Sequence, residues 1–221
     1  MSSATRCNGN PSPRRNRVVP FGDIEATGCR GTLMGNRGDL HGKDGTPSVK
    51  WRLKRWITCT LEEISGHRVA FDRPGFYTPL FFADEAVSLA AGHRPCARCR
   101  RNNYEHFRHR WKAAHGLPYD VHISATEIDN VLHAARIDSD GRKVTHEARL
   151  ADLPDGVFLT ISDTPREALL LWRGYVHPWS HEGYGEPKLV SPHTAVTSLT
   201  PKPIIRAIRA GYTPNTSIEP I

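Results

Sequence analysis

The sequence predicts an α+β protein in which a small antiparallel sheet and flanking helices surround a zinc site, followed by a C-terminal α+β part. Residues 50–61 alternate between apolar and basic side chains, which is typical of a strand. The apolar stretches 67–71 and 76–82 lie on either side of an Arg-Pro-Gly turn and predict two more strands. Several segments with helix-capping residues follow, and a Cys-x-x-Cys motif lies between two of them.

The composition limits the class of protein. The chain has 221 residues, of which 38% are hydrophobic, so it can bury a substantial core as one large domain or two small ones. It contains neither an apolar run long enough to cross a bilayer nor a secretory signal, so we expect a cytoplasmic protein without a membrane partner. The 30 Lys and Arg against 23 Asp and Glu give a net charge of +7, which favours a polyanionic partner.

The composition along the chain suggests four regions. Residues 1–20 are rich in Arg, Pro, Ser and Asn and predict a disordered basic arm, which could enter a minor groove. Residues 21–120 are expected to form a zinc-binding, nucleic-acid-binding domain that begins with a glycine-rich loop over 28–45. Residues 121–149 would be a helix and linker, and residues 150–215 a C-terminal α+β subdomain.

The alternation over 50–61 assigns side chains to two faces of the predicted strand. The apolar odd positions are expected to be buried: Trp51, Leu53, Ile57, Cys59 and Leu61. The even positions Lys50, Arg52 and Lys54 would form an exposed basic face. This pattern places Cys59 on the buried side.

Three helices are expected in the middle of the chain. Asp84 can cap a short helix that ends at Gly92. A second helix is predicted over 102–115, with one apolar stripe made of Tyr104, Phe107 and Trp111. A third begins near Ser124, where Glu127 completes a capping box.

The C-terminal part reads as strands followed by a helix. A Leu-Pro-Asp-Gly turn at 153–156 precedes predicted strands over 157–161 and 168–172. Pro201 opens a final helix that stops at Gly211.

The cysteines predict a metal site. Two thiolates spaced as Cys96 and Cys99 can grip one tetrahedral ion, and five cysteines in a chain without a secretory signal favour ligands over disulfides. Cys59 and Cys29 are the expected third and fourth zinc ligands, and Cys7 is expected to be free. If Cys29 is not bound, the substitutes are His41 first, then His67 and His93.

Residues 83–101, ADEAVSLAAGHRPCARCRR, resemble the second half of the metal-binding module of the Ada family of DNA-repair methyltransferases. In that module an alanine-rich helix leads through Gly, Arg and Pro into Cys-x-x-Cys. The resemblance implies that Cys96 and Cys99 bind zinc within a small sheet with flanking helices, in a DNA context. It does not carry the methyl-acceptor activity, because the Cys-x3-Cys pair of Ada is absent and Cys29 and Cys59 stand far apart.

Basic residues around the motif predict a surface that binds DNA, with RNA as an open alternative. The expected nucleic-acid contacts are Arg30, Arg37, Lys50, Arg52, Lys54, Arg94, Arg98, Arg100, Arg101, Arg108 and Lys112. A solvated basic face without a ligand is the other interpretation of this pattern.

The glycine-rich loop carries Asn36, Asp39 and His41, which together with Arg37 could hold a phosphate, a metal or an attacking water. Asn36, Asp39 and His41 are the candidate catalytic residues. The favoured function is that of a zinc-containing DNA-binding enzyme, a hydrolase or lyase that repairs or processes damaged or modified DNA, of glycosylase, lyase or nuclease type. Two alternatives remain open, a non-enzymatic transcriptional regulator and an alkyl acceptor that uses Cys29 or Cys59.

Overall fold

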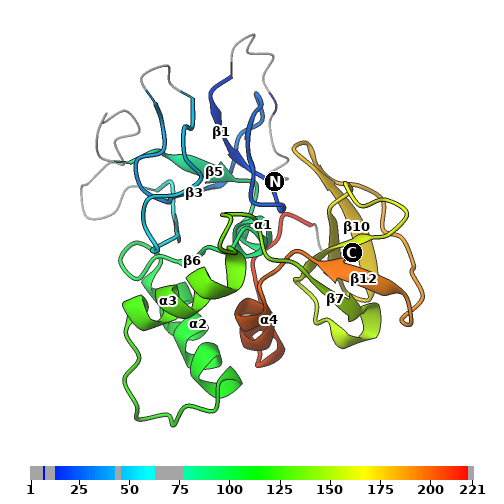
Figure 1. The fold of residues 1–221 in the computed structure, drawn as a ribbon. Helices are drawn as coiled ribbons and strands as arrows, with labels where there is room; N and C mark the ends of the chain where they lie inside the picture. The colour runs from blue at the N-terminus through cyan, green and yellow to red at the C-terminus, as the bar shows by residue number, and fades with distance from the viewer. Residues whose placement is uncertain (1–6, 8–12, 43–45, 63–76, 219–221) are drawn as a thin grey trace.

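The computed structural model describes Cys7 and residues 13–42, 46–62 and 77–218. Within these residues it contains two six-stranded sheets and four α-helices, which confirms the predicted α+β class (Figure 1). Helix α1, Glu85–Ala90, lies between the two sheets and contacts a strand of each. Among the described helices, none is both long enough and apolar enough to cross a membrane.

The first sheet has the strand order β2-β1-β5-β3-β4-β6. Its strands are β1 Arg15–Val18, β2 Ile24–Ala26, β3 Leu33–Asn36, β4 Ile57–Cys59, β5 Leu80–Phe82 and β6 Arg94–Pro95. The prediction of an antiparallel sheet is wrong for two of its pairs, because β1 runs parallel to β5 and β4 runs parallel to β6. The parallel pair β4 and β6 arises because the chain returns through α1 before it forms β6.

The predicted basic arm 1–20 contains strand β1. Arg15 and Arg17 alternate with the buried Asn16 and Val18, so the strand has an inner and an outer face. Residues of β1 pair with β2 on one side and with Phe81 of β5 on the other. The prediction of disorder is wrong for this segment. We interpreted the charge of the arginines as a sign of disorder and so missed the period-two pattern of a strand.

Strand β3 lies inside the glycine-rich stretch 28–45 that we predicted to be a loop. It is a central strand, antiparallel to both β4 and β5. At Gly35 a Cβ atom would come within 2.1 Å of the Ile57 carbonyl oxygen, so this glycine permits close pairing of β3 with β4.

The predicted strand 50–61 is shorter than expected, because only Ile57–Cys59 forms β4. Leu53 and Leu61 are 41% and 37% exposed, whereas Trp56 is only 2% exposed. The segment before β4 instead folds over the loop after β3, where the Arg37 carbonyl accepts the backbone N–H groups of Arg52 and Leu53. Cys59 is half-buried, and the predicted strand 67–71 lies outside the described residues.

The helices follow their predicted caps. Asp84 accepts a hydrogen bond from the Val87 amide at the start of α1, and Gly92 adopts a φ of +86° just beyond its end. Ser124 and Glu127 form the predicted capping box. The other helices are α2 Arg101–Ala114, α3 Ala125–Arg136 and α4 Lys202–Arg209. As expected, the stripe made of Tyr104, Phe107 and Trp111 is buried.

The second sheet has the order β11-β10-β9-β8-β12-β7, and its neighbouring strands pair antiparallel. It contains β7 His146–Arg149, β8 Phe158–Ile161, β9 Leu169–Trp172, β10 Tyr175–Ser180, β11 Gly183–Tyr184 and β12 Ala195–Ser198. A short 3-10 helix, Leu150–Asp152, follows β7. Strands β8 and β9 confirm the two predicted C-terminal strands, while β7 lies in the predicted linker.

The two sheets share a buried core. One apolar cluster contains Leu80 and Phe82 of β5, Val87 of α1, and Phe158 and Leu170 of the second sheet. The predicted regions 21–120 and 150–215 therefore pack on the same helix. A second cluster joins α2, α3 and α4 beneath them.

Two buried carboxylates fix the C-terminal segment to α1. Asp84 accepts hydrogen bonds from the Tyr184 hydroxyl at 2.7 Å and from the backbone of Ser217 at 3.0 Å. Glu85 accepts one from the Tyr212 hydroxyl at 2.6 Å. The start of α1 is thus a junction between the first sheet, the second sheet and the chain end.

Candidate metal centre

Three cysteines from two chain segments meet at one edge of the first sheet. Cys59 ends β4, and Cys96 follows β6 directly. Because these strands are parallel, with Thr58 opposite Pro95, their next residues lie side by side, and the Cys96 amide donates to the Thr58 carbonyl at 2.9 Å. Cys99 comes from the turn before α2. The three sulfur atoms all lie within 4.8 Å of one another.

The turn that follows Cys96 points backbone N–H groups at the sulfurs. The amides of Arg98 and Cys99 donate to the Cys96 sulfur, and the Thr60 amide donates to the Cys99 sulfur. The Arg100 amide closes the turn on the Cys96 carbonyl at 3.1 Å. Such N–H groups stabilise negative charge on sulfur, which is the form that binds a metal.

The three sulfurs cannot all be charged without a cation. The pKa of Cys96 is lowered to about 2, first by hydrogen bonds from the thiols of Cys59 and Cys99. The pKa of Cys59 is raised by its hydrogen bonds to the same two cysteines, and the pKa of Cys99 is raised as well. These opposite shifts arise because the sulfur of Cys96 accepts hydrogen bonds from the other two thiols. A divalent ion would take the place of the two protons.

Buried ion pairs hold the frame around the cluster. Arg94 of β6 forms a two-pronged pair with Asp129 of α3, at 2.8 and 2.7 Å. Arg100 pairs with Glu85 of α1 at 2.8 Å. The sequence interpretation missed both acids. The sequence feature that could have revealed Asp129 is its position beside Ile128 on the apolar stripe of α3, because a buried acid there needs a cationic partner.

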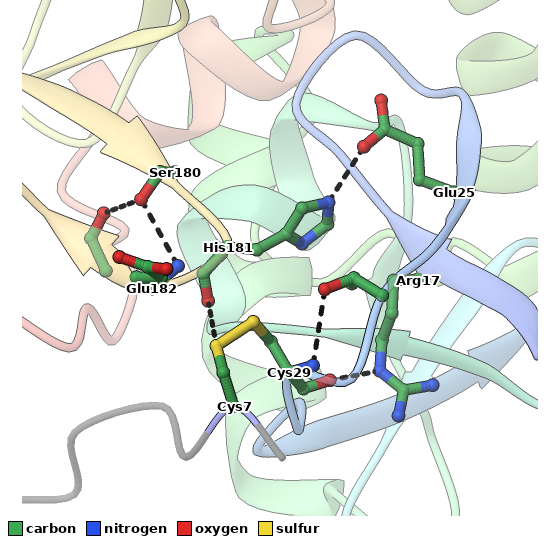
Figure 2. The surroundings of a disulfide bond; sticks show 9 residues. Cys7, Arg17, Glu25, Cys29, Ser180, His181 and Glu182 are labelled. Atoms are coloured by element: carbon green, nitrogen blue, oxygen red, sulfur yellow. Dashed lines mark hydrogen bonds and ion pairs between the residues drawn. A yellow bond between two sulfur atoms is a disulfide. The ribbon is translucent and has the colours of Figure 1, made fainter. Parts of the chain in front are cut away.

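The prediction of Cys29 as the fourth ligand is wrong, because Cys29 forms a disulfide with Cys7. Cys7, which we expected to be free, is its partner. Figure 2 shows this bond beside the turn after β10, where the Cys7 sulfur lies 3.9 Å from the carbonyl oxygen of His181. Arg17 donates to the Cys29 carbonyl at 2.6 Å, and His181 bonds Glu25 at 2.8 Å. The odd cysteine count did not reveal this pair.

The histidines proposed as substitutes are engaged elsewhere. His41 bonds the Thr78 hydroxyl through Nδ1 at 2.9 Å, and His93 accepts a hydrogen bond from Arg37 at 3.3 Å. His67 lies outside the described residues. In the described part of the chain the cluster thus offers three sulfur ligands.

The structure buries four of the residues predicted to contact nucleic acid, namely Arg37, Arg94, Arg100 and Lys112. Arg94 and Arg100 pair with buried acids, and Lys112 donates to the Tyr119 carbonyl. For Arg94, Arg100 and Lys112 the assignment to an exposed surface is wrong, because sequence proximity to exposed arginines did not reveal these acids and this carbonyl. Arg108 is half-buried and pairs with Glu105.

Six predicted contacts remain on the surface: Arg30, Lys50, Arg52, Lys54, Arg98 and Arg101. Arg98 and Arg101 lie in the cysteine turn and at the start of α2. Lys54 precedes β4 and, through its carbonyl, accepts a hydrogen bond from Arg136 at 2.5 Å. The exposed cations next to the cysteine cluster are therefore fewer than the sequence suggested.

The three candidate catalytic residues are spread along one stretch of chain. Asn36 ends β3 opposite Ile57, and Asp39 accepts a hydrogen bond from Arg52 through its backbone carbonyl at 2.7 Å. His41 is engaged with Thr78. Neither Asp39 nor His41 belongs to a possible metal-binding group among the described residues. Their catalytic role stays a prediction.

Comparison with known proteins gave no match, whether the chain was compared with family models, with curated proteins or with solved structures.

Proposed function

We propose that Cys59, Cys96 and Cys99 bind a structural zinc ion in a cytoplasmic protein that binds DNA and repairs or processes damaged or modified DNA. The observation that carries this proposal is the meeting of three sulfurs within 4.8 Å. Zinc holds thiolates at about 2.3 Å in a tetrahedron, which separates the sulfurs by roughly 3.8 Å. A small contraction around the ion would reach that spacing.

Zinc fits this donor set better than calcium or magnesium, which prefer oxygen ligands. Three sulfurs leave one coordination position for a further ligand. Amide hydrogen bonds to the sulfurs and the buried pairs of Arg94 and Arg100 hold the donors in place before the metal binds. We therefore assign the ion a role in fixing β4, β6 and α2 relative to one another.

The surface beside the cluster supports DNA as the partner. Arg98 and Arg101 project from the turn that the zinc would fix, and Lys50, Arg52 and Lys54 precede the strand that carries Cys59. The net charge of +7 adds long-range attraction to a polyanion. The resemblance of residues 83–101 to the zinc module of Ada proteins favours DNA within this class.

The chemistry within this proposal is hydrolytic or lyase-like, with Asn36, Asp39 and His41 as the residues to test. A regulator that binds DNA without cutting it is the alternative. The alkyl-acceptor alternative loses Cys29, because a sulfur in a disulfide has no S–H group and cannot form the thiolate that would attack an alkyl group.

Metal content and duplex binding test the proposal together. Protein purified without added metal should contain one zinc per chain by native mass spectrometry, and Cys96→Ser should lose it. Fluorescence anisotropy on labelled duplexes should then show binding that weakens with salt. A metal-free wild-type protein, or zinc-loaded protein that ignores duplexes in dilute buffer, would contradict the proposal.

Incubation with duplexes that carry damaged or modified bases, followed by denaturing gels, separates an enzyme from a regulator. Strand or base loss that Asp39→Asn or His41→Gln abolishes would assign the chemistry to this loop. A regulator would shift the duplexes without altering them.

A further inference from the structure

A group of buried cations surrounds Trp56, the residue that precedes β4. The guanidinium groups of Arg37 and Arg136 each lie 4.0 Å from the centre of a Trp56 ring. Arg37 is 2% exposed and Arg136 is 1% exposed. Arg37 follows β3 and Arg136 ends α3, so the fold brings them together from distant parts of the chain.

Backbone carbonyls engage part of these side chains. Arg37 donates to the Gly22 carbonyl at 2.9 Å and to the ring of His93 at 3.3 Å. Arg136 donates to the Gly92 carbonyl at 2.8 Å. These bonds explain how the guanidinium groups are oriented, and they place Arg136 at the C-terminal end of α1, where a cation is favourable.

Other N–H groups of the same side chains are buried without an acceptor. Among the residues that the structure describes, the Arg37 Nη2 and the Arg136 Nε have no hydrogen-bond partner. A buried guanidinium N–H without an acceptor is costly, and most such groups in proteins are satisfied. The hydrogen bonds to backbone carbonyls therefore leave these two guanidinium N–H groups for a further acceptor to satisfy.

Lys143 adds a third cation to the group. Its ammonium donates to the Ala90 carbonyl at 2.5 Å. Burial, followed by the nearby charge of Arg37, lowers the pKa of Lys143 to about 7, and burial lowers the pKa of both arginines to about 9. The cations destabilise one another, and Asp23 is the acid that opposes both Arg37 and Lys143.

The group lines a recess with an open pocket next to it. The recess has a volume of about 30 Å³, and its charged lining consists of Asp23, Arg37, Lys50, Arg136 and Lys143. The adjoining pocket has about 480 Å³ and shares Gly22, Asp23, Arg37 and Lys50 with the recess. Four cations against one carboxylate give the recess a strong positive potential.

We propose that this recess binds the phosphoryl group of a phosphate monoester, with the organic part of the ligand in the adjoining pocket. A phosphate monoester carries a charge of about −1.5 to −2 at neutral pH and presents three acceptor oxygens. Arginine forks suit such oxygens, and Lys50 at the shared wall can contact the same group. A recess of this size has room for oxygen atoms, and the sugar or other group needs the larger space.

The inference goes beyond the proposed function, because it concerns a small anion and does not require a duplex. Two sources would supply the same chemistry, a free nucleotide and the phosphorylated end of a strand.

The ring of His93 helps to orient Arg37. Burial and the charge of Arg37 hold the pKa of His93 well below its usual range, which favours the neutral ring that accepts the Arg37 hydrogen bond.

Calorimetric titration of the full-length protein tests the site with inorganic phosphate, a nucleoside 5′-monophosphate, the matching nucleoside, and a short oligonucleotide with and without a 5′-phosphate. We expect the monophosphate to bind and the nucleoside not to bind. Equal binding of the monophosphate and the nucleoside, or no heat with either phosphate, would overturn the proposal. Preference for the 5′-phosphorylated strand over the free nucleotide would assign the ligand to a strand end.

Lys50→Gln is the first variant, since Lys50 is exposed and its loss should leave the fold intact. We expect its affinity for the monophosphate to fall about tenfold, as for the loss of one hydrogen bond to a charged group. Lys202→Gln removes an exposed lysine on α4 that lines neither the recess nor the adjoining pocket, and should bind like the wild type. Equal affinity of Lys50→Gln and Lys202→Gln would contradict the site.

Lys143→Met provides a second variant that alters the inner wall. Phosphate should raise the melting temperature of the wild type above that in chloride of equal ionic strength, and this increase should shrink in the variant. If the wild-type protein binds phosphate but does not bind duplexes, the result counts against the proposed function and leaves the phosphate site standing.

Discussion

The cysteine cluster and the cation group around Trp56 both gather groups of like charge in one place, but the charges have opposite signs. The first gathers three sulfurs that need a cation before all can be charged. The second gathers Arg37, Arg136 and Lys143 around a recess in which Asp23 is the acid among the lining residues, so the charges of the lining sum to a positive value. The spacing of Cys96 and Cys99 is a recognisable sequence motif, whereas Arg37, Arg136 and Lys143 are far apart in the sequence and share no motif. A local motif therefore makes the cysteine cluster easier to predict from the sequence than the cation group.

The largest expected effect is the loss of stability when the cysteine cluster cannot bind metal. Cys96→Ser should lower the free energy of unfolding by about 4 kcal/mol relative to the zinc-loaded wild type, the gain expected for a ligand present at a thousandfold excess over its Kd. Urea unfolding with and without a chelator measures this difference. The chelator should have little effect on the variant.

Cys7→Ser is the matched control for that experiment, because Cys7 belongs to the disulfide and not to the cluster. It should retain one zinc per chain. Loss of zinc in Cys7→Ser would show that the disulfide pair takes part in metal binding.

The next effect concerns the buried pair that supports β6. Asp129→Ala leaves Arg94 buried without its partner, so we expect destabilisation of about 3–5 kcal/mol. Glu105→Ala removes the partner of Arg108 at a partly exposed site and should cost about 0–1 kcal/mol. Chemical unfolding of both variants measures the contrast, and similar losses in the two would argue against the buried pair as a structural support.

The cation group predicts a dependence of stability on pH. The folded-state pKa of Lys143 is about 7, below its ordinary value of 10.5, so the unfolded chain binds more protons between these values. The free energy of unfolding should therefore rise with pH across this window, by up to about 1.4 kcal/mol per pH unit for this lysine. Arg37 and Arg136, with pKa values of about 9, add to the rise at the alkaline end.

Urea unfolding of the metal-loaded protein at several pH values measures that slope. Lys143→Met should flatten it near neutral pH. A bound phosphate monoester should flatten it as well, because the anion returns the pKa of Lys143 toward that of a free lysine. A slope of the opposite sign in the wild type would contradict the burial of this charge.

The smallest expected effect is on the salt dependence of DNA binding. Arg98→Gln combined with Arg101→Gln should reduce the slope of log affinity against log salt by about two, if each arginine neutralises one phosphate. Arg166→Gln removes an exposed charge in the loop between β8 and β9 and should leave the slope unchanged. Anisotropy titrations over a range of salt concentrations compare the variants.

Sequence patterns predicted those features that depend on neighbouring residues. Caps at Asp84 and Ser124, the apolar stripe of α2 and the strands β8 and β9 all follow from local rules. The convergence of Cys59 with the Cys-x-x-Cys motif was also predicted, since the motif needs a further ligand.

Features set by distant contacts could not be predicted in this way. Strand β3 exists because Gly35 allows β4 to approach closely, which a local view of glycine interprets as a loop. Arg94 and Arg100 look like surface charges until Asp129 and Glu85 are placed beside them. Cys29 was assigned to the wrong partner because nothing near Cys7 in the sequence marks it for pairing.

X-ray absorption at the zinc edge would test whether the cysteine cluster is a metal centre. We expect a first shell with three sulfur atoms at about 2.3 Å and one nitrogen or oxygen atom, since the other two cysteines form the disulfide. A shell of nitrogen and oxygen atoms alone, or purified protein without bound metal, would contradict a zinc site at Cys59, Cys96 and Cys99.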